Sequence, residues 1–408
     1  MGCSNSRVDV NINVPSLVTR SFHEEYLLAG KICSGQFSHV YLATKFANAT
    51  TSEPKHVVKV IDTVRCIKGE ASDSPRCKNM MNQSRIELEL LLLKKVRAIS
   101  TCVTLTDIVH EAGFVYIVTE RCDTLVQTLD RMRVLTERAL LKLLEGILSA
   151  LVAIHGIEII HRDIKPDNML VSNGATKLCD FGLGMAWAPD RAIGIFGTPP
   201  YMSPEMLSGS GYDAKTDVWS FGVVLYTLVF GRFPYQPSTL SAKSMKDAIR
   251  KDRPVPDFVP YKGNVVISRG ATELVQRVLC RNPGERMSAG EALADFAEAA
   301  VICDDRRCLR PMIEAARRVG AFDDHEKSRQ QETEQDRLMN ALQRRYHKCT
   351  PFQPFSPASD SSSSADVGQL LGSPRSVSSS SDAGRPRSSA HIGDKRSSSI
   401  STVSTTSD

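Results

Sequence analysis

The chain has 408 residues and a net charge of +5, and its Lys and Arg residues are dispersed rather than gathered into one stripe with aromatic residues, which argues against nucleic acid as a partner. Eleven cysteines without paired C-x-x-C spacings indicate reduced cytosolic thiols and argue against a zinc site. No run approaches the ~20 apolar residues of a membrane-spanning helix, so membrane contact has to come from another feature.

The first six residues, MGCSNS, form a candidate lipid-attachment signal. They match the pattern M-G-x-x-x-S/T, in which methionine removal exposes the amine of Gly2 for myristoylation, and Cys3 is a candidate for palmitoylation. One myristoyl chain binds a membrane only marginally, whereas two acyl chains anchor stably. We therefore expect residues 1–25 to be an acylated segment that holds a cytoplasmic protein peripherally on a cytoplasmic membrane leaflet. Myristoylation alone and no lipid are the alternatives.

Residues 26–61 alternate apolar residues with turn signals and predict consecutive strands. The first turn contains a loop that keeps only Gly35 of the three glycines in the phosphate-binding pattern G-x-G-x-x-G. Cys33 and Ser38 occupy the other two glycine positions. Lys59 follows on a strand, in the sequence HVVKVI. Such a loop alone is weak evidence for a phosphate site, so the residues downstream decide its meaning.

A helix is predicted over residues 84–96, and it offers two carboxylates as partners for Lys59. Glu89 is preferred because the apolar residues four and seven positions later share its helical face, which should look into the domain. Glu87 is the fallback. Solvated helix charges are the alternative for both glutamates.

The densest motif is HRDIKPDNML at residues 161–170, followed after a short hairpin by D-F-G. It supplies a carboxylate that can accept a hydroxyl proton, Asp163, and two groups that can hold metal ions, Asn168 and Asp180. With Lys59, these segments match H-R-D-x-K-x-x-N, D-F-G and the strand lysine of V-A-I-K. The chain thus resembles the eukaryotic protein kinase family, and Lys165 is a mark of its serine/threonine type.

The resemblance implies an α+β, bilobal protein kinase fold over residues 26–296, with a small β-rich N-lobe and a larger helical C-lobe. It also implies transfer of the γ-phosphate of ATP to Ser or Thr of protein substrates, with Mg²⁺ held by Asn168 and Asp180. Asp163 would deprotonate the substrate hydroxyl, and Lys165 would stabilise the transferring group. A monomer is expected. An inactive scaffold is the alternative, although no residue needed for catalysis is lost.

The resemblance further implies which residues surround ATP. Lys59, paired with Glu89, would orient the phosphates under the glycine loop. Adenine would lie between strand residues above and one leucine below, with the backbone of residues 120–122 reading its edge. The residues assigned to this site are Ile32, Gly35, Val40, Val57, Lys59, Glu89, Glu120, Cys122, Leu170 and Asp180.

Two further matches are architectural. Glu205, in the sequence SPE, is expected to form a buried ion pair with Arg286. Asp217, in the sequence DVWSFG, is expected to brace the catalytic loop.

The activation segment, residues 183–197, contains no Ser, Thr or Tyr, so the usual loop phosphosite has no acceptor. Arg162, which in the family answers a loop phosphate, is nonetheless present. Asp190 is the only fixed negative charge within the segment that can satisfy it. We therefore expect activity without loop phosphorylation. Cys33 and Ser38 add bulk beside the phosphates, which is compatible with weaker ATP binding but does not imply its loss.

The chain beyond the catalytic domain divides into two parts. Residues 297–350 have helical composition and predict a helical C-terminal extension, either a solvated helix packed on the larger lobe or an autoinhibitory or calmodulin-like target helix. Residues 351–408 are dominated by Ser and predict a disordered tail open to phosphorylation. The sequence FQPFS at 352–356 resembles a kinase hydrophobic motif that docks on the small lobe. Exposed phenylalanines between turn-forming prolines are the alternative.

Overall fold

The computed structural model describes residues 20–35, 38–46, 53–64, 83–187, 192–239, 241–261, 265–302, 308–322 and 333–347. Gly2 and Cys3, Asp190 and the whole tail from residue 351 lie outside the described residues. The expectations that concern them therefore stay predictions.

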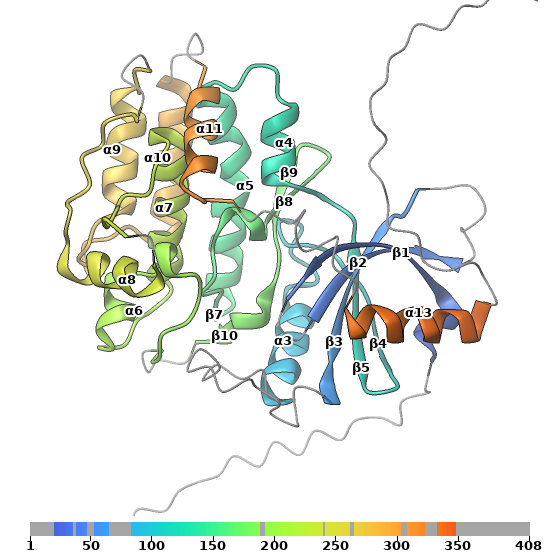
Figure 1. Cartoon of the computed structure of the whole chain (residues 1–408). Coiled ribbons are helices and arrows are strands. Elements are labelled where there is room, and N and C mark those ends of the chain that lie inside the picture. Colours follow the sequence, from blue (N-terminus) through green and yellow to red (C-terminus); the bar gives the residue numbers. More distant parts are fainter. Residues whose placement is uncertain are drawn as a thin grey trace, which may run out of the picture. The chain divides into compact units, whose positions relative to one another are not determined.

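A five-stranded antiparallel sheet forms the N-lobe, with its strands in the order β1-β2-β3-β5-β4 (Figure 1). Side chains alternate across the sheet, so Ile117 joins the apolar cluster under helix α3, whereas Tyr116 and Val118 join a second cluster on the opposite face. The elements are β1 (Tyr26–Ser34), β2 (Ser38–Lys45), β3 (His56–Asp62), α3 (Gln83–Val96), β4 (Leu105–Glu111) and β5 (Phe114–Glu120).

Helices dominate the C-lobe, and α5 runs through its core. The side chain of Thr136 caps the start of α5 by accepting a bond from the amide of Ala139. By length and composition α5 could cross a membrane, which corrects the expectation that no run of the sequence approaches such a span. Its buried leucines and isoleucines belong to the C-lobe core instead. The helices are α4 (Leu125–Arg131), α5 (Glu137–Gly156), α6 (Pro204–Ser208), α7 (Lys215–Phe230), α8 (Ala242–Lys251), α9 (Arg269–Val278) and α10 (Ala289–Ile302).

Short elements hold the segments that carry the sequence motifs. The catalytic loop lies between β7 and β8, and the D-F-G turn lies between β9 and β10. β8 pairs with β6 and β9, and β10 pairs with β7, so both segments are fixed at each end by a strand. These elements are β6 (Asp123–Thr124), β7 (Ile159–Ile160), η3 (Pro166–Asn168), β8 (Met169–Ser172), β9 (Ala175–Leu178), η4 (Phe181–Leu183), β10 (Met185–Ala186) and η5 (Pro199–Tyr201). The expected α+β, two-lobed fold is confirmed.

The helical extension divides between the two lobes. Helix α11 (Arg310–Arg318) packs against α7 in the C-lobe, as expected. Helix α13 (Glu334–His347) instead lies on the N-lobe sheet, on the face opposite α3 (Figure 1). The expectation that this part of the chain packs on the larger lobe is therefore wrong for α13. The physical reason is that the outer sheet face is aromatic and needs cover, which α13 provides together with the short helix α1 (Phe22–Glu25).

Candidate active site

Lys59, on strand β3, forms ion pairs with two carboxylates. Its Nζ lies 2.7 Å from Oε1 of Glu89 on α3 and 2.8 Å from Oδ1 of Asp180 in the D-F-G turn. Burial alone would lower the pKa of Lys59, but the two carboxylates outweigh it and raise that pKa. Chiefly through Lys59, the pKa of Asp180 is held far below its usual value. Lys59 and Asp180 are therefore both charged at neutral pH. Glu87, the fallback partner, is exposed.

The register of the sheet shows which of the residues assigned to ATP share one face of it. Cys33 on β1 lies opposite Val40 on β2, which lies opposite Lys59, so these three share one face with Val57. All are partly buried, as are Ile32 and Leu170 of β8. The loop between β1 and β2 is closed by a bond from the amide of Gly35 to the carbonyl of Ser38, 2.7 Å long.

The hinge follows β5. The side chain of Glu120 accepts a bond from the amide of Thr104 and pairs with Lys177, so its carboxylate is committed there. Any contact of Glu120 with adenine therefore has to come from its backbone, as expected. Burial raises the pKa of the Cys122 thiol to about 11, which keeps it protonated at neutral pH.

Asp163 of the catalytic loop is 8% exposed, and both oxygens of its carboxylate have partners. Its Oδ1 accepts bonds from the amide of Thr198 at 3.0 Å and from its hydroxyl at 2.8 Å. Lys165 lies 3.1 Å from the other oxygen and 3.2 Å from the Thr198 hydroxyl. Asn168 donates to the Asp163 backbone carbonyl at 2.8 Å. The loop residues assigned from the sequence thus meet at one carboxylate.

Gly197 makes the contact between Thr198 and Asp163 possible. Its φ is +98°, a conformation that residues with a side chain rarely adopt. A Cβ at this position would lie 2.4 Å from the carbonyl oxygen of Arg162. A glycine therefore lets the activation segment reach the catalytic loop.

Asp217 of α7 fixes the backbone of the catalytic loop by accepting hydrogen bonds from it. It accepts bonds from the amides of His161 and Arg162, each 2.8 Å long, and from the His155 ring at 2.9 Å. Burial alone would raise the pKa of Asp217, but these donors lower it. The expected bracing role matches this geometry.

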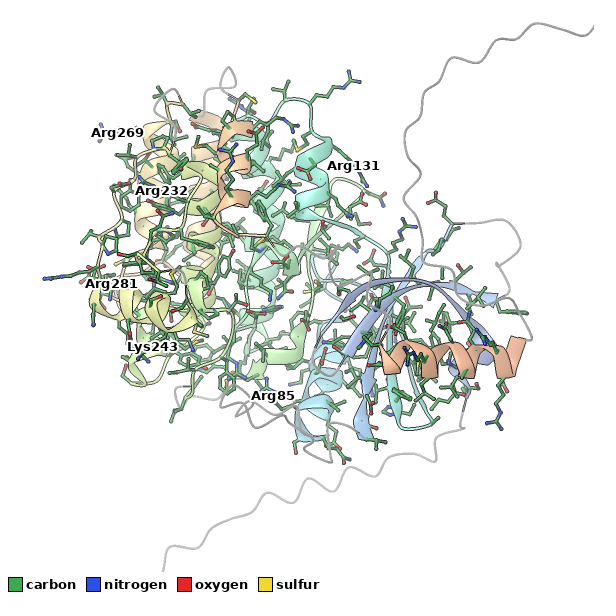
Figure 2. All side chains as sticks on the ribbon, viewed as in Figure 1. Arg85, Arg131, Arg232, Lys243, Arg269 and Arg281 are labelled. Carbon is green, nitrogen blue, oxygen red and sulfur yellow. The ribbon has the colours of Figure 1, made fainter. Side chains whose placement is uncertain are left out.

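The Arg162 guanidinium is satisfied without a described carboxylate. It donates to the carbonyls of Leu183 at 2.6 Å and Gly184 at 3.4 Å. It also lies over the ring of Phe196, 4.1 Å from the ring centroid. Arg85 of α3, labelled in Figure 2, approaches the same ring at 5.3 Å and donates to a D-F-G carbonyl.

This arrangement, which we call the Arg85–Phe196–Arg162 stack, was not foreseen from the sequence. A phenylalanine two residues before a threonine gives no pattern that predicts it. The stack connects α3, the activation segment and the catalytic loop.

The chain that follows the activation segment is fixed by a buried ion pair. Arg286 contacts both carboxylate oxygens of Glu205, at 2.6 and 3.0 Å, and stacks over the Trp219 ring. The pairing expected from the sequence is therefore present. A bidentate pair of this kind fixes this part of the chain to the C-lobe.

The donor set fits ATP with Mg²⁺. Among the described residues, no group of three His, Cys, Asp or Glu side chains could hold a metal ion. Mg²⁺ in phosphoryl-transfer sites uses one or two carboxylates together with substrate phosphates, so a full protein cage is not required. Asn168 uses its amide nitrogen towards Asp163, which leaves its oxygen to serve as a ligand beside Asp180.

Comparisons with known proteins agree with this geometry. A family model described as "Protein kinase domain" matches residues 26–296. Serine/threonine-protein kinase ULK3 of Xenopus laevis is 28% identical over 277 residues, which is 66% of this chain and 54% of that protein. Sperm motility kinase 2B of Mus musculus is 31% identical over 279 residues (67% and 51%), and calcium-dependent protein kinase 4 of Solanum tuberosum is 29% identical over 283 residues (68% and 47%).

The chain spans about half the length of the curated relatives it matches. The family match covers well over half of the chain and includes the lysine, the catalytic loop and the D-F-G turn described above. The chain therefore belongs to the protein kinase family.

Proposed function

We propose that the protein is an ATP-dependent kinase that phosphorylates serine and threonine in protein substrates. The observation that carries the proposal is the environment of Asp163, whose carboxylate is held by both Thr198 and Lys165. A base fixed in this way can orient a substrate hydroxyl and accept its proton. The similarity of the chain to serine/threonine-protein kinase ULK3 of Xenopus laevis supports the serine/threonine class.

The described residues divide the work of transfer between them. Lys59, held by Glu89, binds the phosphates of ATP, and Asn168 and Asp180 would hold Mg²⁺. When bound, Mg²⁺ neutralises negative charge on the phosphates. Lys165 lies beside Asp163, where its ammonium can stabilise charge on the transferring group.

Phosphate transfer from labelled ATP and Mg²⁺ to serine, threonine and tyrosine peptides tests this proposal. Transfer is expected to serine and threonine only. Asp163→Asn keeps the shape of the side chain and should abolish transfer while nucleotide binding persists. A folded wild-type protein that binds ADP but phosphorylates no peptide or protein would support the inactive scaffold instead.

We also propose that activity does not require a phosphate in the activation segment. The support is that the Arg162 guanidinium already donates to two carbonyls and the Tyr212 hydroxyl and lies over the Phe196 ring, where a phosphate would otherwise bind. Protein treated with phosphatase should keep its full rate. A rate that falls on phosphatase treatment and returns with phosphorylation within the catalytic domain would contradict this.

Membrane tethering by acylation of Gly2 and Cys3 is a further proposal. The first described helix, α1, packs beside α13, whose Arg344 and Arg345 side chains are exposed. Exposed basic residues near the point where an acylated segment joins the domain would add attraction to an anionic leaflet. Gly2→Ala should release the protein from membranes, and Cys3→Ser should weaken the association. Membrane fractionation of tagged full-length variants measures both, and unchanged partition of Gly2→Ala would refute the tether.

A further inference from the structure

In the proposed kinase the hairpin of β1 and β2 covers the phosphates of ATP. Helix α13 contacts this hairpin on its outer face. Asp336 of α13 pairs with Lys31 of β1, with 2.7 Å between Oδ2 and Nζ. Its other oxygen accepts a bond of 2.7 Å from the hydroxyl of Tyr41 on β2. One carboxylate, contributed from about 300 residues later in the chain, therefore ties both strands of the hairpin together.

Burial makes this tie costly to break from one side. The Lys31 and Asp336 side chains are 5% and 6% exposed, and Tyr41 is almost fully buried. Breaking a buried ion pair by removing one partner leaves the other charge without compensation, which is costly. Asp336 also accepts bonds from the amide and the hydroxyl of Thr333, so its orientation is fixed at the start of the helix.

The tie lies directly behind the ATP-facing residues. Lys31 and Tyr41 are opposite each other in the sheet, and both contact α13. A register shift between Lys31 and Cys33 pairs Cys33 with Val40, whose side chain alternates with that of Tyr41 and therefore lies on the nucleotide face. His39, between Tyr41 and the loop, contacts the Thr333 hydroxyl at 2.9 Å. The first turn of α13 thus holds the hairpin where its strands enter the phosphate loop.

Gln335 of α13 donates to the carbonyl of Val60 on β3, whereas the polar contact of Gln343 is farther along the sheet. Gln343 exchanges two bonds with the backbone of Leu28, 3.0 and 3.3 Å long, towards the start of β1. Met339 packs among the aromatic residues of the outer face. The Gln343 and Met339 contacts dock the helix away from the entrance of the loop, so Gln343 provides a matched control.

We propose that Asp336 is a positioning residue for ATP, which holds the phosphate-covering hairpin in its binding conformation through Lys31 and Tyr41. The need for such support follows from the loop itself, because it keeps one of the three glycines expected there. The other two positions carry Cys33 and Ser38, which restrict the backbone conformations of the loop. The position of the loop relative to the phosphates therefore depends on the two strands that it joins. The inference rests on the proposed kinase function.

The test uses the full-length chain with Asp336→Asn, and with Gln343→Ala as the control on the same helix. Asp336→Asn should raise the Kd for MgADP and the KM for ATP about 10-fold, the effect of about 1.4 kcal/mol, with little change in kcat. Gln343→Ala should lower the melting temperature but leave both nucleotide constants near the wild-type values. Tyr41→Phe, which removes only a hydroxyl, should raise Kd in the same direction by a smaller factor.

Calorimetric titration with MgADP separates this inference from the proposed function, because it needs no phosphate transfer. If the wild type transfers no phosphate but Asp336→Asn still weakens MgADP binding, the kinase proposal fails and the positioning role stands. Unchanged Kd in folded Asp336→Asn overturns the positioning role, and so does an equal rise in Gln343→Ala. If Asp336→Asn does not fold, an unchanged Kd for Tyr41→Phe overturns it.

Discussion

Replacing Phe196 by alanine removes the ring that two arginines share, and its effect can be worked out from the structure. The guanidinium carbons of Arg162 and Arg85 lie 4.1 and 5.3 Å from the ring centroid. A cation–π contact is worth about 0.5–1 kcal/mol when exposed and about 2 when desolvated. Arg162 is buried and Arg85 partly so, which gives a combined loss of about 2.5–3 kcal/mol.

The loss should fall on the active arrangement, because the stack connects α3, which carries Glu89, to the catalytic loop. About 2.5–3 kcal/mol corresponds to a decrease of about 70- to 150-fold in kcat/KM. Phe196→Tyr keeps the ring and should retain most of the activity, whereas Phe196→Leu fills the space without a π face and should resemble Phe196→Ala. Steady-state peptide phosphorylation by phosphatase-treated proteins measures all three.

The reasoning would be refuted if Phe196→Ala kept the wild-type kcat/KM. Equal rates for the Leu and Tyr variants would show that volume matters and the π face does not. A melting temperature close to the wild type in Phe196→Leu would confirm that its lower rate comes from the active site and not from unfolding.

Three further changes test other contacts of the site. Glu89→Gln should lower kcat/KM at least about 10-fold because it weakens the charge-assisted bond to the β3 lysine, while Glu87→Gln on the exposed side of α3 should leave it unchanged, and equal effects would contradict the assigned pairing. Arg286→Met leaves Glu205 buried without its partner and should lower the free energy of unfolding in urea by about 3–5 kcal/mol; a loss below about 1 kcal/mol would contradict it. Gly197→Ala forces a Cβ against the catalytic loop, so kcat should fall while the Kd for MgADP stays constant, and an unchanged kcat would contradict the steric argument.

The contacts that the sequence predicted well are those fixed by local spacing. Glu89 was preferred over Glu87 from helical periodicity alone, and the structure pairs it with Lys59. Glu205 and Arg286 are far apart in sequence, but each lies in a short motif whose partner the family resemblance supplies. In both cases the identity of the residue and its position in one element were sufficient.

The position of α13 could not be predicted in this way, because helical composition says nothing about where a helix docks. A signal was nevertheless present in β5, whose sequence FVYIV has no polar face. A strand buried on both faces needs cover on both faces. Helix α3 covers one, and the aromatic residues Tyr26, Tyr41 and Tyr116 on the other required a second cover that the catalytic domain sequence did not otherwise provide.

The environment of Arg162 was missed for a different reason. The only fixed negative charge in the sequence of residues 183–197 is Asp190, which lies outside the described residues. A guanidinium has five N–H donors and a flat face, so carbonyl oxygens and an aromatic ring can satisfy it without any anion. Charge patterns along a sequence do not show such partners.

The two departures from the family pattern therefore have the same physical form. The glycine-poor loop lacks conformational freedom, and the activation segment lacks a phosphate acceptor. In each case another contact lies where the missing feature would act: Asp336 of α13 behind the loop, and Phe196 of the activation segment itself between the two arginines. In the proposed kinase, the nucleotide-covering hairpin and the activation segment are thus held by fixed packing.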